Sequence, residues 1–176
     1  MALDRTWYNN LVDDDGSNTV GTVWGKDDIK NLLDSVDAEL TAQLTPFTWT
    51  PYIGSAGGGG ATYVLQSGLG LKAGKLVAVT GRVILASKGS LVAGQANMVG
   101  FPYVPSAVTY QGGLIFPGAA GLAVAVSSLG GYFVAGSPTA NLTYFPAAGA
   151  TSAAGLDTTQ IGATADFIFA GLYRID

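Results

Sequence analysis

The spacing of apolar residues changes at Pro46. Before this proline, in residues 26–43, apolar side chains recur every three or four positions, which is the period of one helix face. The sequence therefore predicts an amphipathic helix over residues 26–43. Its apolar stripe must pack against the β part of the chain, against sister helices of other copies, or against another protein. The stripe consists of Ile29, Leu32, Leu33, Val36 and Leu40.

After Pro46 the pattern becomes one of short apolar or alternating stretches separated by Gly, Pro, Ser or Asn. Short strands at such spacing predict a mainly β fold, a jelly-roll-like antiparallel β-sandwich. The candidate strands are 47–53, 61–66, 75–86, 92–99, 107–111, 113–116, 121–127, 131–135, 141–145 and 165–174.

Three of these stretches carry more specific expectations. Residues 165–174 are largely apolar, as in a strand buried in the middle of a sheet. Residues 75–86 are interrupted by Gly81, where a bulge or bend would fit. A turn over residues 87–90 should then join this strand to a hairpin partner.

Charge divides the chain at the same place as periodicity. Residues 1–44 hold nine acidic and three basic side chains, a net charge of −6, and residues 45–176 hold three acidic and five basic, a net charge of +2. We therefore expect two parts: an N-terminal attachment arm with its helix over residues 1–44, and a β-sandwich domain over residues 45–176. Neither part has the basic stripe that neutralises phosphates, so no nucleic-acid partner is expected.

Composition favours self-association. Charged residues make up only 11% of the chain, hydrophobic residues make up 48%, and there are 26 glycines. Much of the surface must therefore be neutral and small, and such a surface is usually hidden in part against copies of the same chain or a larger assembly. The composition predicts an oligomer.

The residue types available limit catalysis. The chain contains no His and no Cys, which removes the commonest general base and the commonest ligands of transition metals. Paired carboxylates could still hydrolyse glycosides, but the β part supplies only Asp157, Asp166 and Asp176. We expect a non-enzymatic protein, with a glycan-depolymerising enzyme as the weaker alternative.

No cofactor or metal is expected either. Asp13, Asp15 and Gly16 resemble part of a calcium loop, but Leu11 and Thr22 would stand at ligand positions, so a solvated turn is the better interpretation. Residues 68–74 and 57–60 have neither the spacing of a dinucleotide loop nor that of a P-loop, and we expect turns or surface loops there.

The N-terminal residues lack the basic start and apolar run of a signal peptide. The most apolar stretch, residues 112–136, is interrupted by Pro117 and several glycines, which argues against membrane insertion. We expect synthesis and assembly in the cytoplasm.

Several motifs together resemble fibre proteins of tailed bacteriophages. The N-terminal segments 3–17 and 21–34 resemble the N-termini of tail-fibre and head-fibre proteins, and scattered motifs of the β part resemble their jelly-roll modules. The similarity covers roughly residues 1–105. The β motifs are Phe47-Thr-Trp-Thr-Pro, Thr62-Tyr, Gly74-Lys-Leu-Val, Leu85-Ala-Ser-Lys-Gly and Gly100-Phe-Pro.

The resemblance implies a virion location, attachment to the particle through the N-terminal segment, and a homotrimeric β module. The chain has no shaft, which favours a head-decorating or cementing protein, or a short head fibre, bound to the major capsid protein or another virion protein where symmetry matches. The alternative is a short tail fibre that binds host surface glycan.

Two sets of residues are candidates for these contacts. In the arm, Trp7, Tyr8 and Trp24 could anchor the attachment or form only a local hydrophobic cluster, and the helix stripe would supply further buried area. In the β part, tyrosines could contact a glycan, although tyrosines more often lie in a core or an interface. These are Tyr103, Tyr110 and Tyr132.

Overall fold

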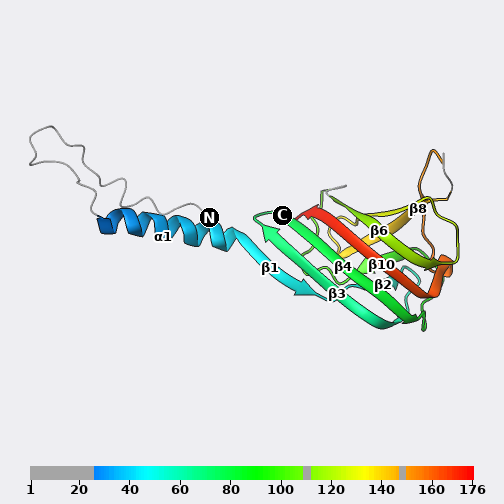
Figure 1. Ribbon diagram of the computed structural model, residues 1–176. Coiled ribbons are helices and arrows are strands. Elements are labelled where there is room, and N and C mark those ends of the chain that lie inside the picture. The colour runs from blue at the N-terminus through cyan, green and yellow to red at the C-terminus, as the bar shows by residue number, and fades with distance from the viewer. Residues whose placement is uncertain (1–25, 109–111, 147–149) are drawn as a thin grey trace, which may run out of the picture. The chain divides into compact units, whose positions relative to one another are not determined.

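The computed structural model describes residues 26–108, 112–146 and 150–176 (Figure 1). The chain divides into two compact units, Met1–Leu44 and Thr45–Asp176. In the first unit, helix α1 (Lys26–Gln43) has the predicted bounds, and Pro46 follows shortly after its end. No helix within the described ranges is long and apolar enough to cross a membrane.

The second unit is built from one antiparallel sheet that curls on itself, and this confirms the predicted jelly-roll-like β-sandwich with a preceding helix. In the described residues the strand order is β1-β3-β4-β10-β6-β7-β8-β5-β2, with β9 beside β8. The strands are β1 (Leu44–Trp49), β2 (Tyr52–Ser55), β3 (Thr62–Ala73), β4 (Leu76–Ser87), β5 (Ala96–Val99), β6 (Gly112–Leu122), β7 (Ser128–Phe133), β8 (Thr139–Phe145), β9 (Ala154–Gly155) and β10 (Ile161–Arg174).

The two edges of the sheet, β1 and β2, are consecutive along the chain, so the curl brings the edges together. Side chains of β3 complete this closure. The Tyr63 hydroxyl accepts a hydrogen bond from the backbone N–H of Ile53 in β2 at 2.9 Å and donates one to its carbonyl at 3.1 Å. Gln66 donates to the carbonyl of Pro51, which links β1 to β2, at 2.9 Å. Tyr63 thus makes the two hydrogen bonds to the Ile53 backbone that a neighbouring strand would otherwise make.

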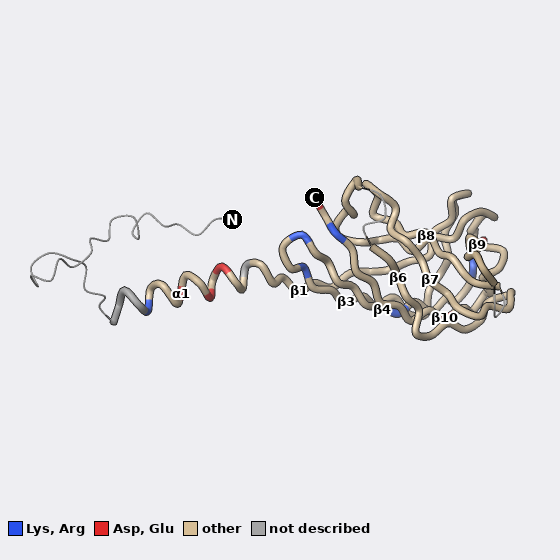
Figure 2. Tube along the Cα trace, turned by 90° about the horizontal axis from the view of Figure 1, so that it is seen from above, with Lys and Arg blue, Asp and Glu red and all other residues tan. Residues whose placement is uncertain are grey.

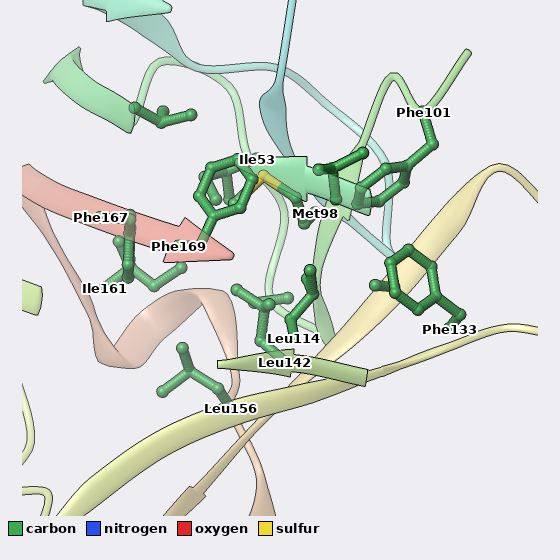
Figure 3. Close-up of a cluster of buried hydrophobic side chains, with 14 of the residues drawn as sticks. Ile53, Met98, Phe101, Leu114, Phe133, Leu142, Leu156, Ile161, Phe167 and Phe169 are labelled. Atoms are coloured by element: carbon green, nitrogen blue, oxygen red, sulfur yellow. The ribbon is translucent and has the colours of Figure 1, made fainter. Parts of the chain in front are cut away.

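The core fills the space between the two halves of the curled sheet. Alternate residues of β4 and β10 point inward, and those of β7, β8, β5 and β2 meet them in one cluster (Figure 3). Aromatic rings dominate its centre. The ring centroid of Phe101 lies 4.9 Å from that of Phe133 and 4.7 Å from that of Trp49, and the ring centroids of Phe133 and Tyr173 lie 4.3 Å apart. Strand β10 lies between β4 and β6, which confirms its predicted place in the middle of the sheet.

Several expected details of the strands are wrong. Strand β3 continues to Ala73, so residues 68–73 are strand rather than turn or surface loop. Gly81 pairs in regular register with both β3 and β10, and the irregularity between β3 and β4 lies at Tyr63 and Leu65 instead. The strand after the turn at residues 87–90 does not pair with β4, whose neighbours are β3 and β10.

The glycines of β3 explain why the sequence was misleading there. A Cβ at Gly68 would lie 2.4 Å from Nε1 of Trp49, and a Cβ at Gly70 would lie 2.1 Å from the Phe47 ring. These positions are glycine because aromatic side chains of β1 lie directly on the strand, not because the chain turns.

Candidate functional site

The outer face of β7, β8, β5 and β2 carries a row of polar and aromatic side chains. Phe133, Leu142 and Met98 point into the core, so the preceding residue on each strand faces outward. The pairing register then places Tyr132, Asn141, Asn97 and Gly54 side by side, one on each strand. We call these four residues the tyrosine–asparagine row.

Hydrogen bonding within the row is partly complete. Asn141 Nδ2 donates to the Tyr132 hydroxyl at 2.9 Å, which fixes the amide beside the ring. Oδ1 of Asn97 is buried and accepts no hydrogen bond from the described residues. A buried amide oxygen without a donor is unfavourable.

The surroundings of the row are neutral. Strands β7, β8, β5 and β2 contain no charged residue. The adjacent outward positions are Tyr52, Val99 and Thr139, which pair across β2, β5 and β8, and the Tyr52 side chain is 41% exposed. Exposed aromatic rings, amides and hydroxyls without charge suit a neutral, hydroxyl-rich ligand better than an ionic one.

The structure separates the three tyrosines that the sequence suggested for ligand contact. Tyr132 lies in the row and is 40% exposed. Tyr103 is half-buried against the core, with its ring 5.3 Å from that of Phe47 in an edge-on arrangement. Tyr110 lies outside the described residues. The structure therefore does not bring Tyr103 and Tyr132 into one site, while it adds Tyr52 and the two asparagines.

The predicted attachment stripe is open on helix α1. Leu33, Val36 and Leu40 are exposed, and Leu32 is half-buried. The neighbouring Lys30 and Asp34 form an ion pair one helical turn apart. Trp7, Tyr8, Trp24 and the Ile29 side chain lie outside the described residues. An exposed apolar stripe on an otherwise polar helix is a surface suited to contact with another protein.

The carboxylates of the β unit have structural partners. Arg82 binds Asp166 through two nitrogens, at 2.7 and 3.0 Å, and this holds the pKa of Asp166 below its usual range. The backbone N–H of Thr159 lowers the pKa of Asp157, which caps the short 3₁₀ helix Thr158–Gln160.

The third carboxylate, Asp176, is held by the hydroxyl of Ser106 and the backbone N–H of Ala107, and these hydrogen bonds lower its pKa as well. A general acid in glycoside hydrolysis needs a raised pKa. The pKa of each of the three carboxylates is lowered, so none of them has the raised pKa of a general acid.

Comparison with known protein families and with curated proteins gives no match. Among solved structures, the fold is similar to that of the Dettilon tailspike protein (gp208), with a TM-score of 0.61 over 76% of this chain and 15% sequence identity. The chain spans only 24% of that tailspike. At this level of identity, the likeness is one of fold.

Proposed function

We propose that the chain is a non-enzymatic virion protein of a tailed bacteriophage, attached to the tail through residues 1–44 and binding host surface glycan with its β unit. The observation that carries the proposal is the likeness of the β fold to a phage tailspike, which agrees with the independent resemblance of the sequence to phage fibre proteins.

The tail position replaces the head position as the preferred hypothesis. The sequence favoured capsid decoration because the chain has no shaft, but the structural likeness is to a tail protein. The tyrosine–asparagine row also supports receptor binding, because it offers a rigid, neutral surface on paired strands. Jelly-roll folds include lectin domains.

Particle labelling tests the location. A gold-labelled antibody against this chain should decorate the tails of purified virions. Label on the capsid would restore the decoration hypothesis, and unlabelled virions would refute a virion role.

A glycan array of bacterial surface polysaccharides tests the ligand. The full chain should bind, and Asn141→Ala should weaken binding about tenfold, because it removes an amide worth roughly 1–2 kcal/mol of hydrogen bonding. Asn31→Ala, the same substitution at an exposed asparagine of helix α1 outside the β unit, is the matched control and should bind normally. Equal binding by both variants would exclude the row as the site.

A further inference from the structure

The outer face of the other half of the sheet is apolar. Its strands are β3, β4, β10 and β6, and the residues that point away from the core are mostly Leu, Ile and Ala. Six large side chains on this face have exposed fractions between 41% and 67%. We call them the apolar face: Leu69, Leu71, Leu76, Ile115, Ile168 and Leu172.

Strand pairing makes these side chains contiguous. Leu71 and Leu172 both pair with Ala78, so the three lie side by side across β3, β4 and β10. Ile115 of β6 pairs with Ala170 of β10 in the adjacent row. Directly opposed residues share one side of a sheet, so the patch extends across four strands, with Thr80 between Leu69 and Ala170 in the second row.

The apolar area of the patch is at the upper limit of what an isolated chain usually exposes to water. Together the six side chains expose on the order of 600 Å², at the upper limit of the largest patch on a typical monomer. This area is close to the roughly 800 Å² that each partner buries in a stable, specific interface. The small residues between the six would supply part of the remaining interface area.

The charges on this face identify the occupant. Arg82 and Asp166 lie within the same face and neutralise each other. Arg174, which pairs with Leu76 at the end of the face, is close enough to the carboxylate of Asp176 to lower its pKa. A surface whose opposite charges are already joined offers little to a charged partner, but it can meet a copy of itself without like-charge repulsion.

We propose that the apolar face is the subunit contact, and that its occupant is another copy of this chain. The inference deepens the proposed function, because it assigns a surface to the trimer that the fibre resemblance implies. In a trimer closed about a threefold axis the contact is heterologous, so one half of the apolar face on each copy meets the other half of this face on the next copy around the axis. The apolar face of each copy is then covered, whereas the tyrosine–asparagine row stays outside.

Light scattering on the full chain tests this inference. The wild-type chain at tens of micromolar should have about three times the chain mass of 17.8 kDa. The double variant Leu69→Lys/Leu172→Lys should have the mass of one chain with an unchanged β circular dichroism spectrum, because both side chains are already exposed in the single chain. Val92→Lys, at an exposed valine in a loop, is the matched control and should keep the wild-type mass.

A milder pair, Leu69→Thr/Leu172→Thr, keeps strand propensity and should raise the dissociation constant at least tenfold, so the test does not depend on the lysine variant folding. A wild-type monomer would overturn both the trimer and the contact. An assembled lysine variant would overturn the contact and leave the trimer standing. A wild-type dimer that the lysines dissociate would support the contact and refute the trimer.

Discussion

Tyr63 provides a sharp test of how the sheet closes. Its hydroxyl is hydrogen-bonded to both the N–H and the carbonyl of Ile53, a residue that is only 1% exposed. Tyr63→Phe removes one oxygen atom and keeps the ring in place. The substitution leaves both backbone groups of Ile53 without their partner, at an edge where water has little access.

We expect Tyr63→Phe to lower the free energy of unfolding by about 2–3 kcal/mol. A net hydrogen bond contributes about 1 kcal/mol, and a buried polar group left unpaired costs roughly 1–3 kcal/mol. For a chain of this size that corresponds to a melting temperature lower by about 5–10 °C. Thermal and denaturant unfolding should be compared at one fixed protein concentration, because assembly makes stability depend on concentration.

Tyr52→Phe is the matched control. Tyr52 precedes Ile53 on the edge strand β2, but its side chain is 41% exposed, so the loss of its hydroxyl should change the unfolding free energy by less than about 0.5 kcal/mol. If Tyr63→Phe were as mild as Tyr52→Phe, the hydroxyl would not hold the edges together. The curl would then depend on core packing alone.

Three further perturbations follow from the described contacts. Gly68→Ala should destabilise the β unit by about 1–3 kcal/mol in urea unfolding, because the new methyl group meets the Trp49 ring. Arg82 lowers the pKa of Asp166, so the ion pair contributes fully to the free energy of unfolding above about pH 4. This contribution disappears as the pH falls through the folded-state pKa of Asp166. Asp166→Asn should therefore reduce the loss of stability at acid pH. Burial raises the pKa of Tyr173, so stability should fall as the pH rises above about 10, and Tyr173→Phe should reduce that fall in an alkaline melting series.

The elements that the sequence predicted well are those whose signal is local. Helix α1 has a stripe of period 3.6 and a proline shortly after its end, and the central strand β10 is largely apolar. Each pattern depends only on residues of the element itself, so it can be recognised without knowing which distant residues pack against it.

The details that failed depend on neighbours far along the chain. The glycines of β3 were interpreted as turns because a single sequence does not reveal that Phe47 and Trp49 lie on them. Gly81 was interpreted as a bulge for the same reason: the space that a Cβ would occupy is filled by the Phe169 ring, 2.5 Å away. The partner of β4 was misassigned because β10, which follows it by more than seventy residues, pairs there instead.

The sequence singles out only one member of the tyrosine–asparagine row. Tyr132 was singled out as an aromatic residue, but Asn141 and Asn97 were not, because an asparagine among short strands is usually a turn signal. A local signal was present in each case: Leu142 and Met98 are core residues, so the residue before each must point outward. That two asparagines on different strands form one row follows only from the pairing register.

The two outer faces of this curled sheet differ in chemistry although they belong to one continuous sheet. The inward positions must be apolar because they fill the core, so only the outward positions of each half can differ to suit a particular partner. In the proposed assembly, the apolar half is buried between copies and each copy keeps its polar row exposed. Single glycan contacts on an open, neutral surface are expected to be weak, and three linked copies would convert them into tight attachment through effective concentration. Disruption of the apolar face should therefore weaken adhesion to a glycan-coated surface far more than binding to a soluble monovalent fragment of the same glycan.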